Sequence, residues 1–298
     1  MRIRIGLGPA GLPSLKRSGD GARFVDYVRR AEQVGYGSIC VGDHLDDRGA
    51  PLALLAAAAV VTDRITLAAH VLCNELRNPT VLAHEARSVQ VISRGRLELG
   101  LGVGWLEHDF ESAGIAIAPF AERLDRLRTT ADRVRRLGGA RDLAAPAIVV
   151  GGGGTKMLTT AAQVADIVTL NIPLRSSAGL AANTVAQGRR AAFDDRLRLV
   201  RDAASAAGRS VGLHVYVHNV HVGPAWSDEV DAAAASLGLS VRDYVASPHV
   251  LAGDLDQIVE TIEHRRAELG IAYLSIPGTF LESFAPVIES LGDRARQR

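Results

Sequence analysis

Cysteine and lysine are both scarce in this sequence of 298 residues. Its two cysteines, Cys40 and Cys73, lie far apart and form no CxxC pair. A disulfide framework and a cysteine-rich metal site are therefore both excluded. Lysine occurs only as Lys16 and Lys156, although the chain has 34 basic residues. Together with the abundance of alanine, this scarcity is typical of a protein from a GC-rich genome.

Long apolar runs and an excess of one charge are also missing. The longest apolar run, Leu52–Val61, is about half as long as a membrane span requires. No apolar segment with a small-residue cleavage site follows the charged N-terminal residues. Charges of both signs are interspersed, and the formal net charge is +1. The sequence therefore predicts a cytoplasmic protein that has neither nucleic acid nor a membrane as a partner.

Short apolar runs alternate with longer segments of helical periodicity along the chain. Parallel strands joined by right-handed helical crossovers give this pattern. Eight such units in 298 residues favour a closed barrel over an open sheet. We predict the α/β class and a single (β/α)8 TIM-barrel domain over residues 1–298. The expected strands are Ile3–Gly8, Ser38–Val41, Ile65–Leu72, Leu97–Val103, Pro146–Val150, Asp166–Leu170, Val211–Val222 and Ala272–Pro277.

Local signals mark helix ends and one insertion. Gly35 is a predicted C-cap, and Asn78-Pro79 is typical of a helix N-terminus. The segment Ala225–Asp254, between the seventh strand and its helix, is expected to form an insertion or lid at the barrel mouth. Catalytic groups of such barrels lie on the loops that follow the strands. Loops expected to line the mouth include Asp46–Ala50, Arg175–Gly179 and Ala225–Val245.

The dipeptide Asp43-His44 follows the second predicted strand. A carboxylate and an imidazole at a barrel mouth can supply a general base and a group that orients a ligand. A turn aspartate followed by a surface histidine is the alternative interpretation.

Alternating glycines end the fourth predicted strand, in Leu99–Trp105. They would let a flat ring approach the backbone, or let the strand pack closely inside the barrel. The spacing does not match the GxGxxG dinucleotide motif, which also opens directly onto a helix.

Four consecutive glycines, Gly151–Gly154, precede Thr155 and Lys156 between a strand and a short helix. Exposed amides at a helix N-terminus bind phosphate well, and Thr155 adds a hydroxyl. The glycine spacing excludes a Walker A loop. A flexible loop is the alternative, but four glycines are costly to order without a purpose. We therefore favour a phosphate site.

Three histidines, His214, His218 and His221, lie on the seventh predicted strand. The two-residue period of a strand places the first two on one face. A zinc site would need a third convergent ligand, such as His44 or His70. Histidines lining the mouth, or hydrogen-bonded inside the barrel, are the favoured interpretation, and we predict no metal.

Together these segments resemble the bacterial luciferase-like monooxygenase superfamily, and within it the coenzyme F420-dependent oxidoreductase branch of actinobacterial type. The resemblance covers nearly the whole chain and depends on the order and spacing of its segments. They are Ser38–His44, Leu67–Leu72, Arg77–Ala83, Gly95–Trp105, Arg123–Leu127 and Pro146–Thr155.

The resemblance implies a role for each matching residue. Asp43 would contact the deazaflavin ring system, and His44 would donate or accept the proton that accompanies hydride transfer. The pair His70-Val71 would form a non-proline cis peptide in a bulge that supports the ring. Further cofactor contacts are implied for Gly104, His108, Gly152, Gly153, Gly154 and Thr155.

One departure bears on the substrate. The sugar-phosphate dehydrogenase branch has a glutamate where this chain has Trp105, and it uses lysines to hold the sugar phosphate. Glucose 6-phosphate is therefore not the expected substrate. We predict hydride transfer between coenzyme F420 and an unidentified small molecule.

Three alternatives stay open. An FMN-dependent monooxygenase using molecular oxygen would keep the fold and change the cofactor. A metal-dependent barrel hydrolase would use His44, His214 and His218, and a flavin-binding paralogue would have no turnover. Family members commonly form homodimers through the helices after strands two and three, where Ala53–Ala59 would allow close packing. A homodimer is therefore implied here as well.

Overall fold

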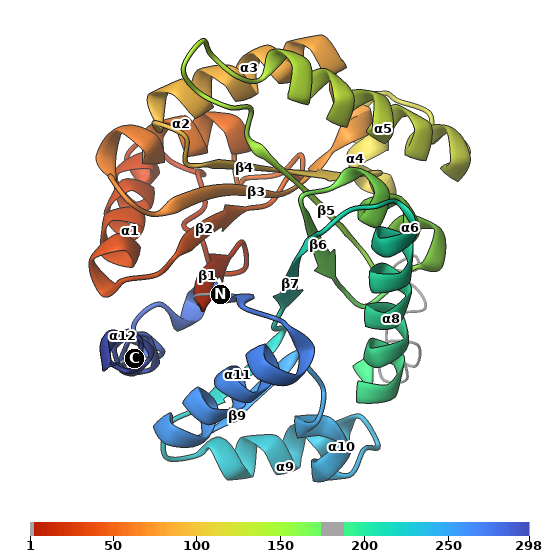
Figure 1. Cartoon of the computed structure of the whole chain (residues 1–298). Helices are drawn as coiled ribbons and strands as arrows, with labels where there is room; N and C mark the ends of the chain where they lie inside the picture. Colours follow the sequence, from red (N-terminus) through yellow and green to blue (C-terminus); the bar gives the residue numbers. More distant parts are fainter. Residues whose placement is uncertain (1–2, 174–187, 298) are drawn as a thin grey trace.

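Eight parallel strands close into a barrel in the computed structural model, which describes residues 3–173 and 188–297 (Figure 1). From β1 to β7, adjacent strands of the barrel follow one another along the chain. Strand β10 comes next in the barrel, because β8 and β9 lie in a separate sheet. The sheet closes because β1 pairs with both β2 and β10. The predicted (β/α)8 barrel is confirmed. Its strands are β1 Arg4–Gly8, β2 Ser38–Val41, β3 Thr66–Cys73, β4 Leu97–Gly102, β5 Ala147–Gly152, β6 Ile167–Leu170, β7 Gly212–Tyr216 and β10 Tyr273–Pro277.

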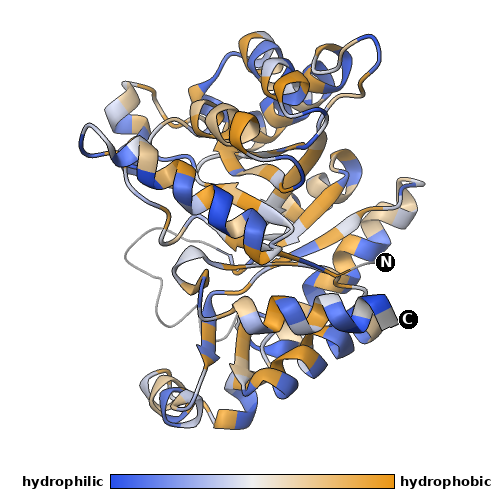
Figure 2. Cartoon of the chain, turned by 90° about the vertical axis from the view of Figure 1, so that its left-hand side faces the viewer, coloured by the Kyte–Doolittle hydropathy of each residue, from blue (hydrophilic) through white to orange (hydrophobic). Residues whose placement is uncertain are grey.

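Helices surround the barrel, and Figure 1 shows α2, α3 and α5 over β3 and β4, with α6 and α8 beside β5 and β6. Their inner faces carry the apolar residues, as Figure 2 shows by the orange colour turned toward the strands. In α1 the buried Phe24, Val28 and Ala31 recur at helical spacing. The main helices are α1 Asp20–Val34, α2 Pro51–Val61, α3 Pro79–Ile92, α4 Glu107–Ala113, α5 Phe120–Leu137, α6 Thr155–Val164, α8 Arg190–Ala206, α11 Leu255–Leu269 and α12 Ala285–Gln297.

The helix-end predictions are confirmed. Gly35 has φ 101°, a left-handed conformation that glycine adopts without a steric penalty, and it ends α1. The Asn78 side chain accepts hydrogen bonds from the amides of Thr80 and Val81 and so caps α3, with Pro79 at its first position. None of the helices in the described ranges is both long and apolar enough to cross a membrane.

The single strand predicted over Val211–Val222 is wrong, because the chain changes partner within it. The barrel strand β7 ends at Tyr216, and β8 (Asn219–Val222) pairs with β9 (Val250–Gly253) in a separate two-stranded sheet. The partner strand β10 ends at Pro277, which has no N–H group to offer to a longer pairing. The amides of His218 and Asn219 instead donate to the His249 carbonyl.

The predicted insertion is present between β7 and α11. It contains α9 (Trp226–Ser236) and α10 (Val241–Val245) as well as β9. These elements form a small apolar cluster of their own around Val230, Tyr244 and Val250. Whether the insertion acts as a lid stays a prediction.

Candidate functional site

All the predicted site residues lie at one end of the barrel. His44 follows β2, His70 and Val71 lie near the end of β3, Gly104 follows β4, and the tetraglycine turn joins β5 to α6. In a closed parallel barrel the carboxyl ends of all strands share one rim. The predicted proton carrier and the predicted phosphate loop are therefore on the same side. The mouth loop Arg175–Gly179 lies outside the described residues.

His44 is held by an aspartate from another loop. Its Nδ1 donates to Oδ2 of Asp109 at 2.8 Å, and the second carboxylate oxygen accepts the Leu45 amide at 3.0 Å. Asp109 is buried, whereas 20% of the His44 side chain is exposed. No hydrogen-bond partner for Nε2 of His44 occurs among the described residues. The carboxylate thus fixes the ring and leaves the other nitrogen available for proton transfer.

Asp109 is not among the predicted site residues, because helix α4 is not predicted from the sequence. This helix has only seven residues, and its apolar content is too low for a periodic signal. Two signals could have located it: acidic residues in the first turn, and Gly114, which ends the helix at φ 66°. His108, the neighbour that was predicted instead, is exposed and lies 3.4 Å from the Ser112 hydroxyl.

The Asp43 carboxylate is bound by other groups of the protein. It is buried and paired with Arg77, with an Nη2–Oδ1 distance of 2.9 Å. It also accepts the Cys73 amide at 2.7 Å. These contacts join the loop after β2 to the end of β3. Asp43 therefore has a structural role in joining these two segments. Its predicted contact with a cofactor ring stays a prediction.

The cis peptide at His70-Val71 is present and coincides with a shift of register between β3 and β4. A Cβ atom on Gly100 would lie 2.9 Å from Val71, and one on Gly102 would lie 2.6 Å from it. Side chains at these positions would collide with the bulge. The alternating glycines thus have a packing role, which was one of the two interpretations of this motif.

Gly104 lies in the turn after β4, where the backbone packs closely against Phe110 and Cys73. Its φ is +74°, and an added Cβ would lie within 2.8 Å of Phe110 and Cys73. Only glycine fits this turn, which leads from β4 to Trp105 and α4. The Trp105 ring then stands edge-on to the His44 ring, with centroids 6.1 Å apart.

The tetraglycine turn leads into an uncapped helix. Helix α6 begins at Thr155, and no side chain in the described part of the chain caps it. Its first amides therefore have no acceptor within the helix. Among the described residues, no atom lies within 4 Å of a Cβ added to Gly154, so these residues leave the turn open at this point. Gly153 instead packs against Pro173, and the Asn171 amide donates to the Gly152 carbonyl.

The histidines of the barrel do not converge. His214 is fully buried and hydrogen-bonded to Thr169 and Ser275, both at 2.9 Å. His218 contacts Asn171, while His221 contacts Glu229 and Tyr244. Within residues 3–173 and 188–297, no group of three or more His, Cys, Asp or Glu side chains could hold a metal ion. The ligand set required by the hydrolase alternative is therefore not assembled in these ranges.

His70 lies against His214 inside the barrel, with ring centroids 4.7 Å apart. Its Nε2 is buried and has no hydrogen-bond partner among the described residues. Burial lowers the pKa of His70 to about 4 and that of His214 well below its usual value. Both imidazoles are therefore neutral near pH 7 and carry no charge toward the mouth.

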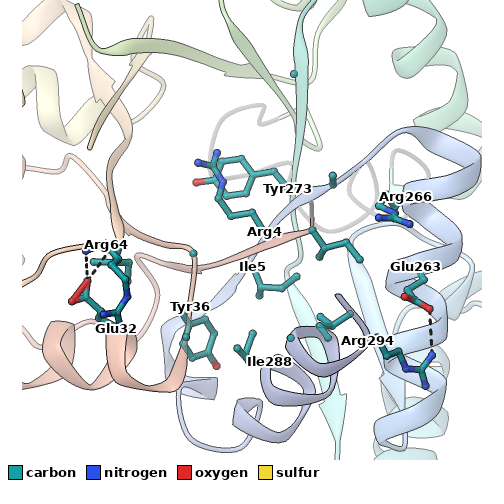
Figure 3. Close-up of a pocket in the computed structure, with 18 of the residues that line it drawn as sticks. Arg4, Ile5, Glu32, Tyr36, Arg64, Glu263, Arg266, Tyr273, Ile288 and Arg294 are labelled. Atoms are coloured by element: carbon teal, nitrogen blue, oxygen red, sulfur yellow. Dashed lines mark hydrogen bonds and ion pairs between the residues drawn. The ribbon is translucent and has the colours of Figure 1, made fainter. Parts of the chain in front are cut away.

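A cavity of about 640 Å³ lies at the opposite end of the barrel (Figure 3). Its lining comes from the N-terminal ends of the strands, including Arg4 and Tyr273, and from α1, α11 and α12. Figure 3 shows the Arg4 guanidinium over the Tyr273 ring, at 3.5 Å from the ring centroid, and Glu263 paired with Arg294. In barrels of this type that end carries stability and not chemistry. We therefore place the candidate active site at the mouth around His44.

The chain belongs to a known family. The profile of the family described as luciferase-like monooxygenase matches residues 1–273. This result confirms the resemblance from which the roles of the site residues were inferred.

Several proteins that are similar to this chain are named as deazaflavin-dependent or flavin-dependent enzymes. Over 124 residues the chain is 36% identical to an F420-dependent glucose-6-phosphate dehydrogenase from Intrasporangium calvum, a match covering 38% of this chain and 37% of that protein. Two solved structures share the fold at 17% identity. One is an F420-dependent secondary alcohol dehydrogenase with an F420–acetone adduct, with a TM-score of 0.71 and coverage of 98% of this chain and 99% of that one. The other is a type II Baeyer-Villiger monooxygenase from Pseudomonas putida with FMN, with a TM-score of 0.68 and coverage of 97% and 96%.

Proposed function

We propose that this protein is an F420-dependent oxidoreductase acting on a small organic substrate at the barrel mouth. The observation that carries the proposal is the His44–Asp109 pair on the same rim as the uncapped N-terminus of α6. One group can move a proton, and the other can hold the phosphate of a cofactor. The name of the 36% identical dehydrogenase supports the choice of coenzyme F420.

The residues present fit such a cofactor. The open space at Gly154 and the amides at the start of α6 would receive a phosphate, with Thr155 adding a hydroxyl. The bulge at His70-Val71 would lie behind a planar ring. When bound, the cofactor would supply or accept the hydride.

His44 would carry the accompanying proton. Asp109 accepts from Nδ1 and so keeps the Nε2 lone pair directed away from the carboxylate. Neutral His44 can then take a proton from a substrate hydroxyl, and protonated His44 can give one to a carbonyl oxygen. The loops around the mouth would exclude water and orient the substrate.

Cofactor titration tests the proposal at its first step. We expect F420 to bind and to raise the unfolding midpoint, because a ligand that binds only the folded state stabilises it. Tighter binding of FMN than of F420 would favour the flavin monooxygenase, whose fold this chain shares. Failure of both cofactors to bind would overturn the proposal.

Asp109→Asn tests the proton path. The substitution removes the charge that holds the His44 ring, so we expect kcat to fall by about 100-fold with the cofactor Kd unchanged. If the protein is instead a flavin-binding paralogue without catalytic activity, the unmodified chain should bind the cofactor and show no turnover.

Thr155→Glu tests the phosphate site. A carboxylate at the start of α6 favours the helix electrostatically but repels a bound phosphate. We expect cofactor affinity to fall by about 10-fold while the unfolding midpoint stays equal or rises. Gln163→Glu places the same charge near the other end of α6 and should leave cofactor affinity unchanged.

We also propose a homodimer through α2 and α3. Helix α2 has no charged residue, and the Val60 side chain is 71% exposed. Val81 and Val91 on α3 are exposed as well. Val60→Arg should convert a dimer into a monomer in light scattering at micromolar concentration. A monomeric unmodified chain would refute this assembly.

A further inference from the structure

The loops at the His44 end of the barrel carry several exposed apolar side chains. Large apolar residues are usually exposed singly on a protein surface, and a cluster indicates a binding site. Here they come from the loops after β1, β2 and β4 and from the start of α5. The exposed residues are Leu15, Leu45, Trp105, Ile115, Ile117 and Phe120.

Hydrogen bonds hold these loops together. The Leu15 amide donates to the Asp47 carbonyl at 2.7 Å, which joins the first loop to the second. The Leu45 amide donates to Asp109 and joins the second loop to α4. Arg123 donates to the carbonyls of Gly104 and Ala118 and so holds the chain on both sides of α4. The apolar side chains are therefore carried by connected and ordered segments.

Trp105 and Leu45 are the members nearest to the proton carrier. Both are 45% exposed, and Leu45 follows His44 directly in the chain. The Trp105 ring stands at 89° to the His44 ring. A substrate that reaches Nε2 of His44 would therefore meet the indole ring of Trp105 and an aliphatic side chain.

The charges beside this surface do not favour an anion. Arg48 is paired with Asp46, Arg77 with Asp43, and Arg123 is bound to backbone carbonyls. Helix α4 also exposes Glu107 and Glu111. In the described loops after β2 and β4, a phosphate or carboxylate group beside Trp105 and Leu45 would meet carboxylates and no cation without a partner; the exposed Arg17 lies on the loop after β1.

We infer that Trp105 and Leu45 select an uncharged aromatic or alicyclic substrate, as an alcohol or the corresponding carbonyl compound. The inference rests on the proposed function, which requires an oxygen that exchanges its proton with His44. In the oxidising direction the hydroxyl proton would pass to Nε2 of His44, and the bound cofactor would accept the hydride from the carbinol carbon. The product would be the corresponding aldehyde or ketone.

Calorimetric titration of two alcohols tests the inference. The probes are 2-naphthalenemethanol and 6-(hydroxymethyl)-2-naphthoic acid, which differ by one carboxylate. Each is titrated into the full chain alone and into the chain loaded with F420. We expect the neutral alcohol to bind about 10-fold more tightly than the acid, because the acid brings an unpaired charge to an apolar wall. Equal or tighter binding of the acid, or no binding of either probe, would overturn the inference.

Variants of the two tryptophans locate the binding surface. Trp105→Ala should weaken the neutral alcohol by about 5-fold, whereas Trp105→Phe should retain most of the affinity because it keeps an aromatic face. Trp226→Phe, in the separate insertion, should change nothing. Unchanged affinity in Trp105→Ala would overturn the inference. So would a change of molar mass in that variant, since the apolar loops would then belong to a subunit interface.

These outcomes are separable from failure of the proposed function. Absence of F420 and FMN binding would remove the oxidoreductase proposal. The titrations of the chain without cofactor would still show whether Trp105 prefers the neutral probe.

Discussion

The two ends of the barrel use charged side chains differently. At the mouth, Asp109 holds one nitrogen of His44 and leaves the other accessible. At the opposite end, Arg96 donates to carbonyls at the ends of α2 and α3 and to the Thr62 hydroxyl. Arg4 is likewise paired with Glu98 and lies over Tyr273. The charged groups of the opposite end therefore serve stability, whereas the Asp109 carboxylate at the mouth leaves one imidazole nitrogen of His44 accessible.

His44→Gln should give the largest effect on the mouth side of this comparison. Glutamine keeps a polar side chain but cannot exchange protons near neutral pH, so turnover should fall by about 100-fold or more. The unfolding midpoint should stay within a few degrees, because His44 is partly exposed. Turnover with F420 and thermal unfolding are the measurements. His264→Gln, on the exposed surface of α11, is the control and should leave both unchanged.

Arg96→Met should give the opposite result. Five hydrogen bonds to buried acceptors are lost, so the free energy of unfolding should fall by about 3 kcal/mol while kcat is retained. Urea unfolding and turnover are compared with those of Arg87→Met, at an exposed position of α3. A large loss of kcat in a folded Arg96→Met protein would break the division between the two ends.

Acid should weaken the fold through the buried histidines between the two ends. The unfolded chain protonates His70 near pH 6.5, but burial delays this in the folded chain to about pH 4. Between these values the unfolded state binds more protons, so stability falls as the pH drops. The contribution of His70 is about 3 kcal/mol at full effect.

His70→Asn measures that contribution, because asparagine does not titrate. Urea unfolding at pH 7 and pH 4.5 should show a smaller loss of stability in His70→Asn than in the unmodified chain. Carboxylates titrate in both proteins and cancel in the comparison. An equal loss in the two proteins would show that His70 does not carry the pH dependence.

Tyr273→Phe should give the smallest effect. It removes a hydroxyl that lies 2.8 Å from Ser38 deep in the barrel, at a cost of about 1 kcal/mol. Turnover should be unchanged, because Tyr273 lies at the start of its strand and not at the mouth. A loss of turnover greater than the loss of stability would connect this end of the barrel to the chemistry.

The sequence alone determined the barrel, its helix caps and most of its rim. Alternating apolar runs, Gly35 and Asn78-Pro79 act through local backbone chemistry, which is readable without tertiary contacts. The order of motifs also determined the family, which the match over residues 1–273 confirms. The roles of the site residues, by contrast, were inferred from the family resemblance and from the positions of the motifs along the chain.

Only the tertiary structure revealed which side chains meet. Asp109 joins His44 across 65 positions of the chain, and Arg77 joins Asp43 across 34. Tertiary packing also ended β7 at Tyr216 and gave the glycines of β4 their role beside Val71. Such contacts depend on how separate loops close on one rim, and no local pattern of residues encodes that distance.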